Sequence, residues 1–189
     1  MISKIILFTS AILTVLFVGC TMQPKAPSKI TPNVANKVSI VSTPTGITVS
    51  MASTASSFEK AISSKGTWII AITKNLTIDK DLVVDGEYKS GNKDASGKDL
   101  IERKIDLYGQ DEDKNRFILT APKLTINSPQ TSIEYGTFKG DLYISSINFQ
   151  LIDAKVDGNV YFTTNQAKST FKMDAKSKVA GKQQLLLVK

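Results

Sequence analysis

The chain has 189 residues, 41% of them hydrophobic and 22% charged, which is enough apolar sequence for one packed domain with appendages. It contains no histidine, so it lacks the side chain most used for acid–base catalysis near neutral pH and the commonest protein metal ligand. A single cysteine excludes an internal disulfide and a multi-cysteine zinc site, and the net charge of +7 is carried almost wholly by lysine.

The N-terminal twenty residues have the pattern of an export signal. A positively charged start and an almost unbroken apolar run over residues 5–18 are followed by Gly19 and Cys20. The run has the length of the apolar segment of a signal peptide and is short for a membrane-spanning helix. The pattern predicts a signal peptide over residues 1–19, with cleavage between Gly19 and Cys20.

This junction resembles the lipobox of bacterial lipoproteins, in which leucine, a small residue and then glycine or alanine precede an acylated cysteine. Gly19 and Val18 occupy the two positions before Cys20, and Phe17 stands where leucine is usual. The resemblance implies that Cys20 is lipidated and anchors the exported domain to the cell membrane, outside the cytoplasm, with each buried methylene adding about 0.8 kcal/mol. Whether this is an inner or an outer membrane is left open. The residues also leave open a secretory signal cleaved elsewhere, an uncleaved anchor, and a structural or reactive cysteine.

Residues 20–53 have the composition of a tether. Four of the six prolines of the chain fall here, and the only charges are three lysines. Such a segment cannot bury enough apolar surface to fold alone, so we predict a semi-extended, flexible spacer. The β-branched alternation over residues 38–50 leaves a short edge strand open as well.

A helix is predicted at the start of the domain that occupies residues 54–189. Ser56 and Glu59 fit a capping box, and the apolar residues after Ser56 recur at helical spacing. Gly66 lies where a glycine commonly ends a helix. The pattern predicts a capping helix over about residues 56–65 that leads directly into a strand.

Short β-rich runs, separated by turn residues, follow the predicted helix. Three of them, "FKGDLYIS", "VDGNVYFT" and "VAGKQQLL", align on Gly140, Gly158 and Gly181, which are 18 and 23 residues apart. Repeats of this length, each with two or three short strands, are typical of the coils of a β-solenoid, whose aligned apolar side chains form one core. Residues 87–102, which are polar and contain glycine, are predicted to form a loop or an inserted turn.

A short helix followed by repeated coils resembles the right-handed parallel β-helix of the pectate-lyase-like class, in which a helix commonly covers the N-terminal end. The resemblance covers about residues 55–189 and implies an all-β fold, a short solenoid. The alternative is an antiparallel β-sandwich, which short alternating strands also fit.

The chain offers few residues for chemistry, and we predict no catalytic residue, no cofactor and no metal. Asp79, Asp81 and Asp85 would share one face of a strand and are the best local cluster for a ligand or an adventitious cation, although a solvated polar strand face is the simpler explanation. Tyr143 and Tyr161 take the same place in two successive repeats. They are expected to pack between coils or to form a sugar-binding ladder.

These patterns predict a non-enzymatic envelope lipoprotein whose domain is a display scaffold or a binding module. The expected partners are the membrane, through the N-terminal lipid, and a cell-wall or surface polymer or a protein. Export and the scarcity of arginine argue against nucleic acid. The apolar last strand has no obvious cap, which favours end-to-end self-association. The alternative function is that of a polysaccharide-active β-helix enzyme, which the missing histidine and scattered acids disfavour.

Overall fold

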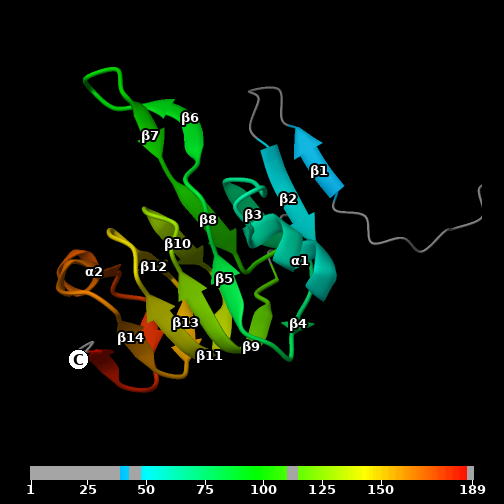
Figure 1. Cartoon of the computed structure of the whole chain (residues 1–189). Helices are drawn as coiled ribbons and strands as arrows, with labels where there is room; N and C mark the ends of the chain where they lie inside the picture. Colours follow the sequence, from blue (N-terminus) through cyan, green and yellow to red (C-terminus); the bar gives the residue numbers. More distant parts are fainter. Residues whose placement is uncertain (1–38, 43–47, 110–114, 187–189) are drawn as a thin grey trace, which may run out of the picture. The chain divides into compact units, whose positions relative to one another are not determined.

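The computed structural model describes residues 39–42, 48–109 and 115–186, which form a mainly β structure of two long sheets and one hairpin (Figure 1). Sheet A contains β1 (Ser39–Ser42), β2 (Thr48–Ala52), β3 (Ile69–Ile72), β8 (Arg103–Asp106), β10 (Thr131–Glu134), β12 (Gln150–Ile152) and β15 (Lys172–Met173). Sheet B contains β4 (Leu76–Thr77), β5 (Leu82–Val84), β9 (Ile118–Ile126), β11 (Thr137–Ile144), β13 (Lys155–Asp157), β14 (Val160–Phe162), β16 (Lys178–Val179) and β17 (Gln183–Leu185).

Successive coils of the chain stack with their strands parallel and in register. In sheet A, β2, β3, β8, β10, β12 and β15 pair in that order, and each of these pairs is parallel. In sheet B, the long strands β9 and β11 pair with each other, β9 also pairs with β4 and β5, and β11 with β13 and β14. Among the strands that the structure describes, only β1 with β2 and β6 with β7 pair antiparallel. This is a β-solenoid-like parallel arrangement, as the repeats predict, and an antiparallel sandwich does not describe it.

The stacking of the three repeated glycines is confirmed. The amide of Gly181 donates a 2.9 Å hydrogen bond to the carbonyl oxygen of Gly158. A Cβ atom at Gly158 would lie 2.0 Å from the carbonyl oxygen of Gly140, and one at Gly181 would lie 2.5 Å from that of Gly158. Neighbouring coils therefore approach so closely at this corner that only glycine fits.

The core runs through the inside of the stacked coils. Because side chains of a strand alternate between its two faces, the same positions of every coil point inward. These positions form columns of buried side chains, namely Ile70, Ile105, Ile133 and Leu151 from sheet A, and Leu119, Phe138 and Val156 followed by Leu124, Leu142 and Val160 from sheet B. A continuous apolar core shared between coils is what stabilises a solenoid.

In the described residues, two short helices accompany the strands. Helix α1 (Ala55–Ile62) buries Phe58 and its neighbouring apolar residues and contacts β2, β3 and β5, so it covers the first coil. Helix α2 (Asn165–Thr170) follows β14 and is anchored by the buried Ala167. The predicted helix is thus present and packs its apolar face on the strands.

The cap of α1 lies two residues earlier than predicted, and the helix is shorter than residues 56–65. Thr54 is the N-cap: its hydroxyl accepts a 3.1 Å hydrogen bond from the amide of Ser57, whose own hydroxyl accepts one of 3.0 Å from the amide of Thr54. The pattern of Ser56 and Glu59 misplaced the cap because serine and threonine crowd this segment, and each of them can cap a helix.

Strands also occur where the sequence predicts a tether. Both β1 and β2 lie within residues 20–53, in the part whose alternation leaves a strand open. Strand β2 pairs in parallel with β3 and so extends sheet A toward the N-terminus. In this segment the β-branched alternation, which predicts a strand, is a better guide than the proline-rich composition, which predicts a tether. A strand forms here because a neighbouring sheet edge supplies partners for its backbone groups.

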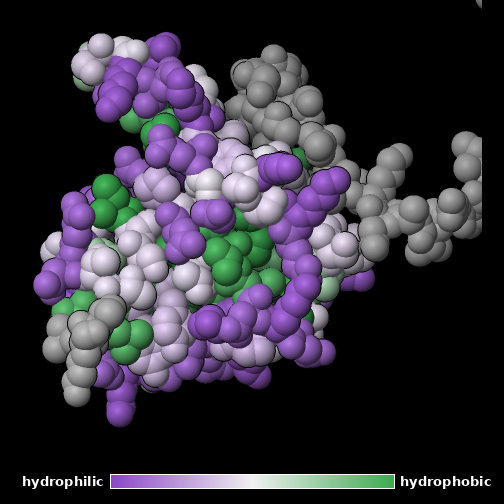
Figure 2. All heavy atoms as spheres, in the orientation of Figure 1, coloured by the Kyte–Doolittle hydropathy of each residue, from purple (hydrophilic) through white to green (hydrophobic). Residues whose placement is uncertain are grey.

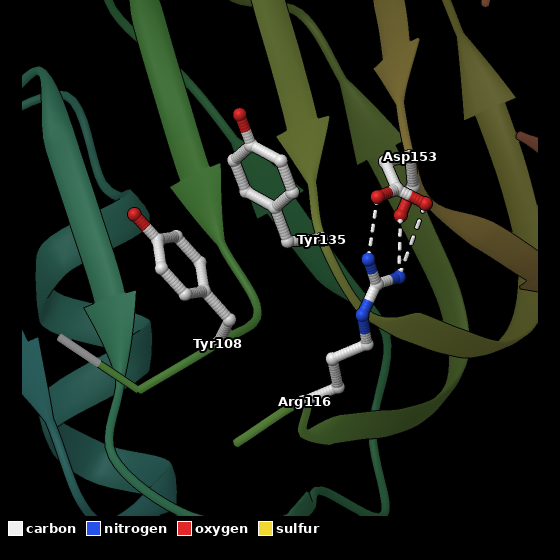
Figure 3. A pocket seen from close by; sticks show the side chains of 4 residues that line it. All are labelled: Tyr108, Arg116, Tyr135 and Asp153. Carbon is white, nitrogen blue, oxygen red and sulfur yellow. Dashed lines mark hydrogen bonds and ion pairs between the residues drawn. The ribbon is translucent and has the colours of Figure 1, made fainter. Parts of the chain in front are cut away.

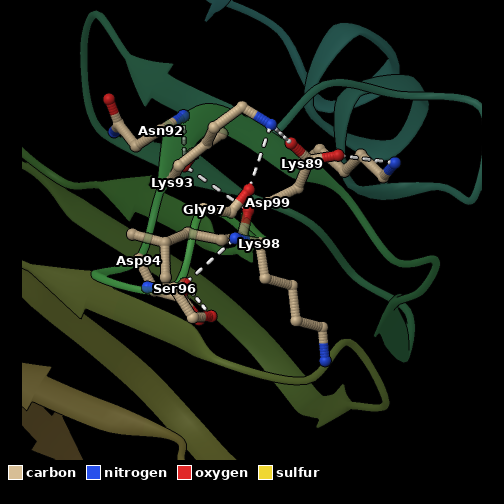
Figure 4. Close-up of polar contacts among 10 residues, drawn as sticks. Lys89, Asn92, Lys93, Asp94, Ser96, Gly97, Lys98 and Asp99 are labelled. Carbon is tan, nitrogen blue, oxygen red and sulfur yellow. Dashed lines mark hydrogen bonds and ion pairs between the residues drawn. The ribbon is translucent and has the colours of Figure 1, made fainter.

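The predicted loop at residues 87–102 contains a hairpin of β6 (Lys89–Lys93) and β7 (Asp99–Ile101), which extends away from the two sheets (Figure 1). The carboxylate of Asp99 accepts contacts from both lysines at the ends of β6, at 2.7 and 2.9 Å (Figure 4). These contacts hold the pKa of Asp99 down at about 2. The segment is therefore an inserted hairpin held by its own polar contacts.

Candidate functional site

The predicted cleavage and lipidation site, Gly19 and Cys20, lies outside the residues that the structure describes. The apolar run over residues 5–18 lies outside them as well. In the described part of the chain, no helix has the length and apolar character needed to cross a membrane. The anchor therefore stays a prediction from the sequence.

The three predicted aspartates surround β5 and do not share a strand. Asp79, Asp81 and Asp85 are all exposed, and the carboxylate of Asp81 lies 2.6 Å from Nζ of Lys123. Figure 2 shows an apolar patch in this region of β5 and α1, where Val83 is 45% exposed. Over residues 39–42, 48–109 and 115–186, no group of three or more acidic or cysteine side chains is placed to hold a metal ion.

Tyr143 and Tyr161 are register partners on β11 and β14, with ring centroids 4.8 Å apart and ring planes inclined by 41°. Their own register neighbours on the flanking strands are Thr125 and Gln184, so the aromatic row is two rings long. The rings therefore pack between adjacent coils, which is the first of the two predicted roles.

A second tyrosine pair lines a pocket. Tyr108 follows β8 and Tyr135 follows β10, and their rings meet edge to face with centroids 4.7 Å apart and planes inclined by 70°. Together with Arg116 and Asp153 they line an open cavity of about 370 Å³, which we call the tyrosine pocket (Figure 3). The pocket joins three coils, because β8, β10 and β12 are neighbours in sheet A.

The shape of the pocket depends on two tight corners. Tyr135 has φ of 64° and Asp153 has φ of 47°, which are left-handed values that non-glycine residues adopt uncommonly. The amide of Tyr135 donates a 3.0 Å hydrogen bond to the carbonyl oxygen of Ile152. The corners of two adjacent coils are thus stacked, and each directs its side chain to the same place.

An ion pair forms one wall of the pocket. One guanidinium nitrogen of Arg116 donates to the carbonyl oxygen of Asp153 at 3.0 Å and to its Oδ1 at 3.2 Å, while the other nitrogen donates to Oδ2 (Figure 3). These hydrogen bonds hold the pKa of the Asp153 carboxyl below its usual value. Asp153 is therefore an ionised acceptor at neutral pH, and it fixes the guanidinium plane of Arg116.

The same ion pair borders a second cavity of about 300 Å³, which we call the second pocket. Its lining residues are Arg116, Phe117, Ile118, Gly136, Thr137, Asp153, Ala154, Lys155 and Lys176. Because Arg116 and Asp153 line both cavities, the two pockets are adjacent, and a ligand of more than one unit can occupy both.

From the sequence we predict a role for Tyr143 and Tyr161, and we do not predict the pocket at Tyr108 and Tyr135. The sequence does contain a signal for this pocket. Two strands end in similar runs, "KIDLYG" and "TSIEYG", and each run contains an acidic residue and then ends in tyrosine and glycine. Comparison with protein-family models, with curated proteins and with solved structures gave no match. The geometry of the tyrosine pocket is therefore the basis for assigning a function.

Proposed function

We propose that this chain is an exported, lipid-anchored binding module, and that its tyrosine pocket binds a sugar unit of a cell-envelope polymer. The observation that carries the proposal is the pocket formed by Tyr108, Tyr135, Arg116 and Asp153. Its volume of about 370 Å³ falls within the range typical of small-ligand sites, roughly 300–1,000 Å³.

The chemistry of the lining suits a carbohydrate. A sugar ring has apolar C–H faces that pack on aromatic rings, and hydroxyl groups at its edge that need donors and acceptors. Tyr108 and Tyr135 supply the aromatic surface with a hydroxyl each, which is the combination that makes tyrosine frequent at wet interfaces. Arg116 supplies fixed donors and Asp153 supplies acceptors. All four side chains are held in place by packing or by the ion pair before a ligand arrives.

The second pocket supports a polymer as the ligand. It shares Arg116 and Asp153 with the tyrosine pocket and adds Lys155 and Lys176 at its rim. Adjacent units of a chain can therefore bind on either side of one ion pair. Such a site agrees with a domain that is carried on a tether beside the envelope.

Binding is favoured over cleavage by the state of the pocket carboxylate. Hydrolysis of a glycosidic bond uses two carboxyl groups, one of them a general acid whose pKa is raised. The tyrosine pocket offers Asp153, whose pKa is lowered by Arg116. Among the described residues that line the pocket, Asp153 is the carboxyl, and a group that stays ionised cannot donate the required proton, so these residues favour binding.

We extend the proposal to the fold and the anchor. The covering of the first coil by α1 supports the right-handed, pectate-lyase-like class of parallel β-helix. The lipobox-like junction at Gly19 and Cys20 supports lipidation, which would hold the module at a membrane outside the cytoplasm.

The test is co-sedimentation of the full chain, purified in detergent, with insoluble bacterial cell-wall polysaccharide. We expect the wild type to bind, and Tyr135→Ala and Tyr108→Ala to weaken binding at least tenfold. Tyr161→Ala is the matched control, because it removes one tyrosine of the Tyr143–Tyr161 pair, outside the pocket, and should leave binding unchanged. Equal binding by all four proteins would refute the role of the pocket, and release of soluble sugar would favour the enzyme.

A further inference from the structure

Two carboxyl groups lie side by side on sheet A, close to the tyrosine pocket. Asp106, at the end of β8, is the register partner of Glu134, at the end of β10. Both residues are buried, with exposed fractions of 8% and 5%. Neighbouring strands are about 4.8 Å apart, so two ionised carboxylates at these positions would repel each other with little water to screen them.

The neighbours of the pair compensate for only part of this charge. On one side, β3 places Ala71 in register with Asp106, and on the other, β12 places Ile152 in register with Glu134. The cation that acts on the pair is Lys104 of β8, whose Nζ lies 3.4 Å from Oε1 of Glu134. Glu102, directly before β8, also acts on Lys104, so with the carboxyls ionised the cluster would keep at least one uncompensated negative charge.

Of the two carboxyl groups, Asp106 is the one with fewer stabilising contacts. Glu134 Oε1 accepts a 2.6 Å hydrogen bond from the hydroxyl of Ser132 in addition to its contact with Lys104. Asp106 Oδ1 is buried and, within the described residues, has no hydrogen-bond partner. Burial, and then the charge of Glu134, raise the pKa of Asp106 to about 7, against the opposing effect of Lys104.

The pair is connected to the tyrosine pocket through the same two strands. Tyr135 directly follows Glu134, and Tyr108 lies two residues after Asp106. Between them, the amide of Leu107 donates a 2.9 Å hydrogen bond to the carbonyl oxygen of Glu134. Burial, and after it the charge of Glu134, raise the pKa of the Tyr135 hydroxyl, so the charge of the pair acts on the pocket.

We propose that the Asp106–Glu134 pair is a proton-binding site that makes the domain, and the tyrosine pocket built on the same strands, responsive to pH. Uptake of one proton lowers the uncompensated charge and so reduces the repulsion between β8 and β10 at this position. Only the consequence for ligand binding depends on the proposed function, because proton uptake itself is measured without a ligand.

The direction of the pH effect follows from the two states of Asp106. Its ordinary value of 3.8 applies to the unfolded chain, and its value in the folded protein is higher, so between these values the folded state holds the proton and the unfolded state does not. The stabilisation is complete below the ordinary pKa of 3.8 and is lost progressively as the pH rises from there to about 7. Over that interval, the unfolding equilibrium constant should rise by up to about tenfold per pH unit from this group.

The first experiment measures thermal unfolding of the full chain in detergent from pH 4.5 to 8.5. We expect the melting temperature of the wild type to fall with rising pH, and Asp106→Asn to flatten the profile and melt above the wild type at pH 8. Asp79→Asn is the control, because Asp79 is exposed, and it should follow the wild type. Parallel profiles for the wild type and Asp106→Asn would overturn the proposal.

The second experiment follows ¹³C-labelled carboxyl and tyrosine ring signals by NMR over the same pH range. The Asp106 carboxyl should titrate near neutral pH, and the Tyr135 ring signals should move with the same midpoint and stop doing so in Asp106→Asn. Titration of Asp106 near its ordinary value, or a profile that changes on adding Ca²⁺, would overturn the proton site. If Asp106 titrates near neutral pH but the protein does not bind cell wall, only the proposed function is refuted and the proton site stands.

Discussion

Arg103 binds the last turn of helix α1 through Ala61, whose carbonyl oxygen accepts a 2.8 Å hydrogen bond from Nη2. The same nitrogen donates to the carbonyl oxygen of Ser63 at 3.0 Å, and Nη1 donates to that of Asp85. Arg103 is 1% exposed, and the central carbon of its guanidinium lies 4.2 Å from the centre of the Tyr88 ring. Arg103 therefore adds donors to carbonyl groups at the end of α1, and it joins the helix to the coils.

We predict that Arg103→Met lowers the free energy of unfolding by about 3 kcal/mol or more, because it removes the four hydrogen bonds that the buried guanidinium donates to Ala61, Ser63, Asp85 and Ser128. Arg103→Lys should also destabilise, since a single ammonium cannot reproduce the planar fork. Chemical denaturation measures both changes. Arg116→Met, which removes the exposed arginine, is the control and should change stability little; an equal loss there would show that the contacts of Arg103 have no special weight.

Substitution at the glycine corner should disrupt the stacking of coils. In Gly158→Ala, the added methyl group would lie 2.0 Å from the carbonyl oxygen of Gly140, so the two coils would have to separate. We expect a loss of about 3 kcal/mol, at the upper end of what overpacking costs. Gly97→Asn, at the tip of the β6–β7 hairpin where the space is open, should be tolerated because asparagine accepts positive φ. Similar melting temperatures for the two variants would contradict the close packing.

Removal of the cap of α1 should have a smaller effect. Thr54→Ala deletes the hydroxyl that accepts from the amide of Ser57, at a cost of about 1 kcal/mol. Ser56→Ala tests the cap that the sequence pattern suggested, and it should be nearly neutral. The two variants are compared by urea denaturation, and a larger loss in Ser56→Ala would place the cap where the pattern put it.

The anchor is tested by the mass and the location of the mature chain. We expect membrane-extracted protein to have the mass of residues 20–189 plus acyl chains, and Cys20→Ser to lose both the acyl mass and the membrane association. An unacylated chain that still fractionates with membranes would contradict lipidation and favour an uncleaved anchor.

The stacking of coils could be predicted because it depends on local repetition. Gly140, Gly158 and Gly181 recur where each coil turns the same corner, and the close approach of backbones there admits no other residue. Strand β2 was harder to predict, since it is stabilised by pairing with two neighbouring strands, β1 and β3.

The site could not be predicted from spacing, because the coils differ in length. Arg116 and Asp153 are 37 residues apart and meet only through the register of the sheets. From the sequence alone, Asp106 and Glu134 are expected to be ordinary exposed acids in alternating strands. Only the pairing of β8 with β10 shows that they are neighbours. Arg103 likewise reads as a surface residue, and its burial depends on the carbonyl groups of α1 that surround it.

The most direct test of the central claim is an NMR titration of the full chain with soluble glycan chains released from bacterial cell wall. The tyrosine pocket predicts saturable shifts in the ring signals of Tyr108 and Tyr135 and in the guanidinium signals of Arg116, with the signals of Tyr143 and Tyr161 unmoved. Shifts confined to Tyr143 and Tyr161, or no shifts at any glycan concentration, would contradict the assignment of the pocket as a glycan-binding site.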